Sequence, residues 1–191
     1  MTGGGGFGEN AGMPHKFTVL YVEDARTLLR NHKRMAEKAI AQVRDEELGV
    51  ALDEESNSIA VLMRHLAGNM KSRWTDFLTT DGEKPDRNRD REFEAGPADR
   101  AALLAEWEEG WSRLFATLDG LSERQLSAAV TIRGEAHSVM QAINRTLAHT
   151  ALHVGQIVML AKHFRSSEWK TLSIARGKSE EYNARMVRGA G

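Results

Sequence analysis

Two histidines four residues apart are the side chains of this sequence best suited to binding a metal ion. His149 and His153 lie in the run HTALHVGQ. On a helix this spacing puts both imidazoles on one face, with Cβ atoms roughly 5–6 Å apart, so two nitrogens can reach one ion. No Glu follows His149, which excludes the His-Glu-x-x-His pattern of metalloproteases and its general base. The spacing alone is a weak signal in a chain with seven histidines.

A third ligand must come from another part of the chain, and His65 is the strongest candidate. It lies beside the apolar stripe of its expected helix, on a polar flank that it shares with Asn69. His163 is a poorer candidate, because ten residues of helix place it about 15 Å along the axis from His153. His32 falls within the apolar stripe of the first expected helix, which favours a hydrogen-bonded core histidine.

Long helices must position these histidines. Only three prolines occur, so long uninterrupted helices are allowed. The expected helices cover about residues 15–47, about 57–78, a segment that begins at Pro97, and about 138–164. The apolar residues on their buried faces are expected to be Phe17, Tyr21, Leu28, Met35, Ala39 and Val43 in the first helix, Ile59, Leu62, Met63, Leu66, Met70, Trp74 and Phe77 in the second, and Leu103, Trp107, Trp111, Leu114 and Leu118 in the third.

The remaining segments complete the expected architecture. The fourth helix is apolar nearly all the way round, which predicts neighbours on several sides. Residues 79–95 carry charges of alternating sign and few apolar residues, which is typical of an exposed loop. Residues 128–132 are the one stretch with an extended pattern. We therefore expect an all-α protein, an antiparallel four-helix bundle with a long crossover loop.

Composition excludes several classes of function. The chain has 191 residues and a formal net charge of −1, which gives no electrostatic reason to expect nucleic acid or an anionic membrane as partner. The lack of cysteine excludes disulfides, Cys-ligated zinc and a cysteine nucleophile. With no apolar stretch near the ~20 residues of a bilayer span and no signal-peptide pattern, we expect a cytoplasmic protein. Residues 1–13 are predicted to be a flexible glycine-rich tail, and 14–191 a single helical domain.

Several blocks of the sequence resemble the DinB-like (YfiT-like) superfamily of metalloenzymes. HLAGNM at 65–70 and HTALHVGQI at 149–157 resemble its histidine motifs, while WTDFLTTDGEKP at 74–85 and EWKTLSIARGKSEEYN at 168–183 are similar to one uncharacterised subfamily. The resemblance covers about residues 15–183. It implies a four-helix bundle, often dimeric, in which three histidines hold one divalent metal ion. Carried over by position, the ligands are His65, His149 and His153.

The resemblance also implies chemistry with an external thiol, because known relatives include S-transferases and isomerases that use bacillithiol, mycothiol or glutathione. Three imidazoles leave positions open on a divalent ion, with zinc or nickel expected, and such an ion lowers the pKa of a bound water or thiol. We therefore expect transfer of a low-molecular-weight thiol to an electrophilic small molecule. Asn69 and Gln156 either orient ligands or substrate there or are polar packing at a helix interface.

Two other functions are compatible with the same histidines. A hydrolase would use metal-bound hydroxide and would not depend on a thiol. A non-catalytic stress-response or scaffold protein would hold a structural metal or none. The lack of a carboxylate base near the histidines in sequence favours the non-catalytic protein, whereas the open coordination position favours an enzyme, since structural zinc sites usually close all four positions. A homodimer is expected from the apolar character of the helices.

Overall fold

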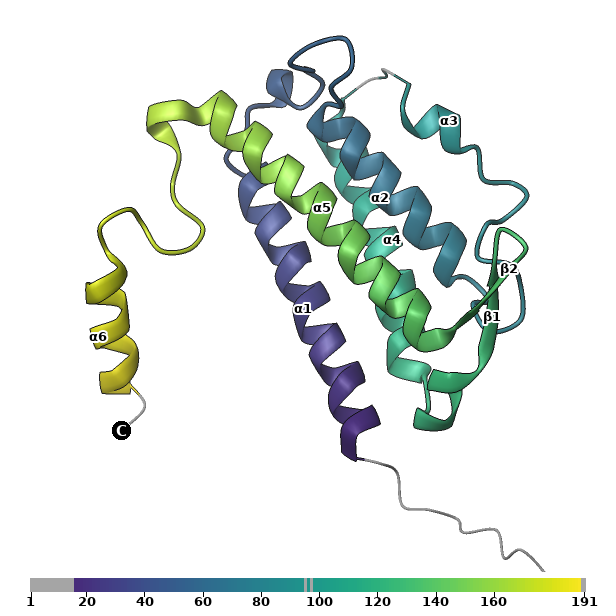
Figure 1. Cartoon of the computed structure of the whole chain (residues 1–191). Helices are drawn as coiled ribbons and strands as arrows, with labels where there is room; N and C mark the ends of the chain where they lie inside the picture. The colour runs from purple at the N-terminus through teal and green to yellow at the C-terminus, as the bar shows by residue number, and fades with distance from the viewer. Residues whose placement is uncertain (1–15, 95, 97, 190–191) are drawn as a thin grey trace, which may run out of the picture.

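The computed structural model describes residues 16–94, 96 and 98–189, so the predicted flexible tail at 1–13 lies outside the described residues. The protein is mostly helical, as predicted, with four long helices (Figure 1). These are α1 (Lys16–Ile40), α2 (Ile59–Trp74), α4 (Arg100–Gly120) and α5 (Val139–Arg165), and the shorter elements are η1 (Asp45–Glu47), α3 (Arg89–Glu92), η2 (Glu123–Ser127), β1 (Ala129–Ile132), β2 (Glu135–Ser138), η3 (Ser166–Glu168) and α6 (Ser179–Gly189). Among the described residues no helix has the length and hydrophobicity that a bilayer span requires.

Three of the long helices begin at a side chain that accepts a hydrogen bond from the first turn. Ser58 accepts from the N–H of Val61 at the start of α2, and Asp99 caps α4 in the same way. Ser138 and Gln141 form a reciprocal capping box at the start of α5. These caps satisfy N–H groups that have no partner within a helix and so determine where each helix begins.

The long helices form two pairs of opposite direction. Within each pair the contacts advance together along both helices, so α2 and α4 run the same way, as do α1 and α5. The ordered contacts are Ala67–Gly110 and Trp74–Thr117 in the first pair, and Tyr21–Asn144 and His32–Thr150 in the second. The prediction of antiparallel helices is therefore wrong within each pair. The physical reason is the crossover from α2 to α4, which returns the chain to the end where α2 began (Figure 1).

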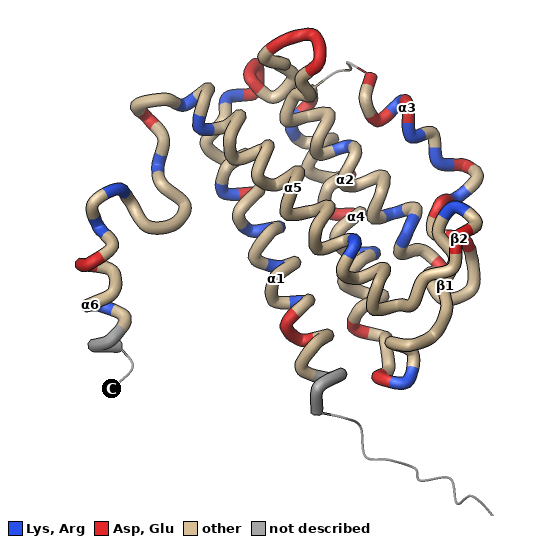
Figure 2. The backbone as a smooth tube through the Cα atoms, viewed as in Figure 1, with Lys and Arg blue, Asp and Glu red and all other residues tan. Residues whose placement is uncertain are grey.

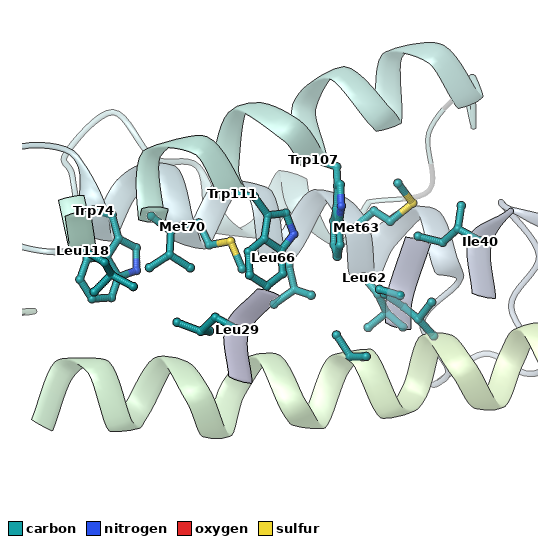
Figure 3. Close-up of a cluster of buried hydrophobic side chains, with 14 of the residues drawn as sticks. Leu29, Ile40, Leu62, Met63, Leu66, Met70, Trp74, Trp107, Trp111 and Leu118 are labelled. Atoms are coloured by element: carbon teal, nitrogen blue, oxygen red, sulfur yellow. The ribbon is translucent and has the colours of Figure 1, made fainter. Parts of the chain in front are cut away.

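The buried side chains form one hydrophobic cluster, in which the predicted stripes of α2 and α4 are confirmed. Figure 2 marks the charged residues along the backbone, and Figure 3 shows Trp74, Trp107 and Trp111 among the methionines and leucines of the cluster. The predicted stripe of α1 is partly wrong: Leu28 and Met35 are each 41% exposed. These two residues lie at the edge of the buried face of α1. The residues of α1 that are buried in the core are Val22, Ala25, Leu29, Ala36, Ala39 and Ile40.

Helix α5 has one exposed face, so the prediction of neighbours on several sides is wrong for that face. Leu152 is 61% exposed and Met159 is 56% exposed. Their spacing of seven residues is two helical turns, which places both on the same side of α5.

The extended stretch predicted at 128–132 is confirmed as β1, but its partner β2 was not predicted. The two strands form an antiparallel hairpin, with Ala129 opposite Ser138. Arg133 and Gly134 at the turn both have positive φ, as a type I′ turn requires. The carboxylate of Asp81 accepts both of their N–H groups at 2.8 Å. The crossover is therefore tied to the hairpin that leads into α5.

Candidate metal centre

Three histidines from two helices meet between α2 and α5. His65 comes from α2, and His149 and His153 come from α5. The Nε2 atom of His149 lies 3.0 Å from Nε2 of His65 and 3.1 Å from Nε2 of His153. Candidate ligand atoms of all three residues lie within 4.8 Å of one another. The structure thus brings together the three histidines predicted as metal ligands, in an arrangement that could hold an ion.

The outer nitrogens of two rings are bound to acceptors, which assigns their tautomers. Nδ1 of His65 donates to Oε2 of Glu92 at 3.0 Å, and Nδ1 of His153 donates to Oε1 of Gln156 at 2.7 Å. With the proton on Nδ1, each Nε2 presents a lone pair to the centre. A proton on Nε2 of His149 could satisfy only one of the two facing lone pairs. A cation bound by all three nitrogens would satisfy the whole group.

The spacing of the nitrogens fits such an ion. A tetrahedral ion with metal–nitrogen distances of about 2.0–2.1 Å places its ligands about 3.3 Å apart. The two Nε2–Nε2 distances of 3.0 and 3.1 Å need only a small adjustment to reach that value. The three rings are nearly perpendicular to one another, with interplanar angles of 79° to 90°. In this arrangement the ring edges that carry Nε2 face a common point.

Glu92 is held rigidly by Arg87. The guanidinium of Arg87 donates to both carboxylate oxygens, from Nε at 2.8 Å and from Nη2 at 2.7 Å. Both side chains are almost completely buried. Such a bidentate pair is geometrically specific. A carboxylate that orients a ligand histidine is a common second partner in metal sites, because it fixes the ring and raises its basicity.

Gly68 gives Glu92 access to His65. Gly68 lies on α2 one turn after His65, and a Cβ at this position would overlap the carboxylate of Glu92, with its Cδ only 2.9 Å away. Phe93, the residue after Glu92, packs its ring 4.7 Å from the ring of His65. The end of the crossover therefore lies directly against α2.

Sequence reasoning missed Glu92 and Arg87. The prediction that residues 79–95 are an exposed loop is wrong for both, because each is paired and buried against α2. No carboxylate base was recognised near the histidines in sequence, and the structure brings Glu92 to His65 from 27 residues further along the chain. The aromatic Phe93 within this charged segment is the sequence signal that could have indicated a docked segment.

Burial favours the neutral, metal-binding form of His149 and His153. Burial, followed by the positive charge of neighbours such as His153 and Arg73, lowers the pKa of His149 to about 3. Burial also lowers the pKa of His153, although its hydrogen bond with Gln156 opposes the shift. Burial raises the pKa of Glu92, but the hydrogen bonds from His65 and Arg87 outweigh it and hold that pKa below its usual range. Neutral imidazoles beside an ionised carboxylate are what metal ligation requires.

The other predicted site residues lie around this group. Asn69 is one turn after His65 on α2 and is 7% exposed, and its side-chain amide forms no hydrogen bond with any described residue. Gln156 is exposed and bonded to His153. His32 bonds Thr150 at 3.0 Å, as expected for a core histidine, and His163 is exposed at the far end of α5.

A pocket of about 730 Å³ lies on the other side of Glu92, toward α4. Gly68, Arg87 and Glu92 form part of its wall, together with charged residues of both signs, and none of the three histidines lines it. The converging nitrogens lie between α2 and α5, so the candidate metal centre and this pocket are separate.

Comparison with known proteins identifies the family. A family model described as a protein of unknown function (DUF1572) matches residues 16–178. Neither the curated proteins nor the solved structures gave a match. The matched segment begins at the first residue of α1 and contains the three histidines and Glu92. The chain therefore belongs to DUF1572, a DinB-like family.

Proposed function

We propose that this protein is a metal-dependent enzyme that transfers a low-molecular-weight thiol to an electrophilic small molecule. The observation that carries the proposal is the convergence of three histidine Nε2 atoms, two of them on rings held by acceptors at Nδ1. Three neutral nitrogen ligands leave coordination positions open, as in catalytic zinc sites. His65, His149 and His153 would hold one divalent ion, zinc or nickel.

The residues of the chain have separate roles in this proposal. A divalent ion bound there supplies Lewis acidity, which favours the thiolate form of a coordinated thiol. Glu92 and Gln156 keep the rings of His65 and His153 in the ligating orientation. The amide of Asn69, which has no hydrogen-bond partner among the described residues, contacts the substrate. Because the chain has no cysteine, the reacting sulfur belongs to an external thiol.

We also infer that the four long helices form the four-helix bundle of DinB-like proteins, and that the protein acts in the cytoplasm as a homodimer on small molecules. The exposed face of α5 with Leu152 and Met159 supports the dimer, because exposed apolar side chains on one helix face are typical of interfaces. Sedimentation of the wild type and of Leu152→Glu tests this part. A monomeric wild type would contradict it.

Thiol consumption during conjugation tests the reaction. Zinc-loaded or nickel-loaded protein is mixed with 1-chloro-2,4-dinitrobenzene and, in turn, with a series of small thiols. Since the protein contains no cysteine, all the thiol that reacts belongs to the substrate. We expect conjugate formation that requires metal, is lost in His153→Ala and is retained in His163→Ala, which removes an exposed histidine outside the centre. Rates equal to those of metal-free protein with every thiol would contradict the proposal.

A further inference from the structure

Arg73, near the C-terminal end of α2, is a buried charge without a partner. The residue is 3% exposed, and its Nε is buried with no hydrogen-bond partner. No described residue forms a hydrogen bond or an ion pair with its guanidinium. Arginine is almost never fully buried unless it is paired, because the lost hydration must be replaced. The described part of the chain supplies no such replacement.

The charges around Arg73 are mostly positive. Those that act on it most strongly belong to Arg145, Arg87, Glu83 and Arg133, in that order. Glu83, the single acidic group of the four, is already bonded to Arg87 at 3.0 Å and to Arg133 at 3.3 Å. Burial, followed by the charges of Arg145 and Arg87, lowers the pKa of Arg73 to about 10, so the residue is still charged at neutral pH. This region therefore attracts anions, although the chain as a whole carries a net charge of −1.

Arg73 follows the histidines along the contact between α2 and α5. At successive turns α2 carries His65, Asn69 and Arg73, and α5, which runs in the opposite direction, carries His153, His149 and Arg145. Both columns therefore lead from the histidines to an arginine, over eight residues or about 12 Å of helix. The charge of Arg73 acts on His149, and that of Arg145 acts on Arg73, as this order requires. Figure 2 shows Lys and Arg on both helices where they approach the hairpin.

The stem of Arg73 is enclosed by neighbouring segments of the chain. A Cβ at Gly82 would lie 3.5 Å from Cγ of Arg73 and 3.2 Å from Cγ1 of Ile132, so the crossover and the hairpin enclose this stem. Ser72 strengthens the same junction, because its hydroxyl donates to the carbonyl of Gly82 and accepts from the N–H of Lys84. The crossover and the hairpin thus hold the stem of Arg73 at one end of the contact between α2 and α5.

We propose that a small molecule with an oxyanion group, such as a carboxylate, binds between α2 and α5 beside the histidines, and that Arg73 binds this group with help from Arg145. A guanidinium binds a carboxylate through two parallel N–H···O bonds, which would satisfy the buried donors. The amide of Asn69 lies between the oxyanion site and the histidines. As far as it concerns the thiol, this inference rests on the proposed function: the co-substrate is a thiol that also carries a carboxylate.

The first arm of the test needs neither metal nor thiol. Propionate is titrated into metal-free, ¹⁵N-labelled protein at low ionic strength, and the Nε–H signal of Arg73 is followed by NMR. We expect a saturable shift of this signal. The variant Arg73→Lys keeps the charge and should still bind propionate, but with lower affinity than the wild type. Binding should be lost in Arg73→Gln and retained in Arg34→Gln, a matched variant at an exposed arginine of α1. An Arg73 signal that does not move would overturn the oxyanion site without any variant having to fold.

The second arm compares 3-mercaptopropionate with 1-propanethiol, which has no carboxylate, on zinc-loaded protein. A charge-assisted hydrogen-bond pair predicts that the first binds roughly 10- to 100-fold more tightly. Arg73→Gln should remove this preference. If neither thiol binds but propionate does, the thiol function is wrong and the oxyanion site stands. If both thiols bind wild type equally and propionate shifts nothing, the oxyanion site is wrong and the thiol site stands.

Discussion

The two sides of α2 are buried in different ways. Toward α4 the buried contact is made mainly by apolar groups and backbone, and it is so close that a Cβ at Gly110 would lie 2.8 Å from Cα of Ala67. Toward α5 the helix buries His65, Asn69 and Arg73, whose polar groups are only partly satisfied by the described chain. On the first side the indole N–H groups of Trp74 and Trp111 are the buried polar atoms left without a partner among the described residues, whereas the second side has binding capacity left for an ion and an anion.

This difference separates stability from function along one helix. Close apolar packing contributes to the free energy of unfolding whether or not a ligand is bound. Buried polar groups without partners cost stability, and that cost is recovered when a ligand binds. Substitutions toward α4 should therefore change the stability of the metal-free protein, and substitutions toward α5 should change ligand affinity.

The largest effect is expected on the α4 side from Trp111→Ala. Trp111 is fully buried, with its ring 5.5 Å from that of Trp107 and 5.6 Å from that of Phe115. Its loss leaves a large cavity, which costs about 3–5 kcal/mol in the free energy of unfolding. Urea denaturation of metal-free protein measures this change. A loss below about 1 kcal/mol would mean that the α2–α4 side is not the main source of stability.

Glu92→Gln tests the α5 side through the orientation of His65. The amide oxygen of the Gln side chain can still accept a hydrogen bond from His65, but it lacks the negative charge that raises the basicity of the ring. Metal affinity should fall roughly 10- to 100-fold, as measured by competition with a chromogenic chelator. Glu83→Gln is the matched control, because Glu83 also bonds Arg87 but is not bonded to a histidine. Equal losses in both variants would show that Glu92 only holds the crossover in place.

Gly110→Ala tests the close approach of α2 and α4 directly. Because the new methyl group would meet backbone atoms of Ala67, the helices must move apart, at a cost of about 1–3 kcal/mol. Gly155→Ala on α5 is the control, since a Cβ there meets nothing within 4 Å. That variant should gain about 0.5–1 kcal/mol from helix propensity. Thermal and urea unfolding measure whether each variant is more or less stable than the wild type. A stabilising Gly110→Ala would be inconsistent with the close packing of α2 and α4.

The smallest effect is expected from pH. The folded protein holds the pKa of His149 at about 3, and that of His153 is also lowered, whereas in the unfolded chain both titrate near 6.5. The unfolded chain therefore binds more protons as the pH falls below about 6.5. The free energy of unfolding of metal-free protein should decrease from about pH 7 to about pH 5, above the range of most carboxyl groups. A value that rises on acidification would place charged histidines in the folded centre.

The apolar side of α2 could be predicted from sequence, but its polar side could be predicted only in part. Helical spacing was sufficient for the buried stripe that includes Met70 and Trp74, because every residue of it packs in one core. Spacing also paired His149 with His153, since both lie on one helix. The stripe of α1 was misplaced by about a quarter turn at Leu28 and Met35, because periodicity alone does not determine which edge of a stripe faces a neighbour.

Residues that join the site through tertiary contacts gave little signal. Glu92 reaches His65 across a long crossover, and its position depends on the missing side chain of Gly68. Arg73 looks in sequence like a basic residue in the last turn of a helix, where positive charge is common. Its burial depends on how the Gly82 segment and the hairpin fold over α2, which helical periodicity does not contain.

The metal content of tag-free protein tests the central claim most directly. Protein purified without nickel is equilibrated with zinc, desalted and analysed by mass spectrometry beside His153→Ala and His163→Ala, with helicity checked by circular dichroism. Three histidine ligands predict about one divalent ion per chain in the wild type and in His163→Ala, and almost none in a still helical His153→Ala. A wild type without bound zinc, or a His153→Ala variant that retains it in full, would contradict the assignment of the centre.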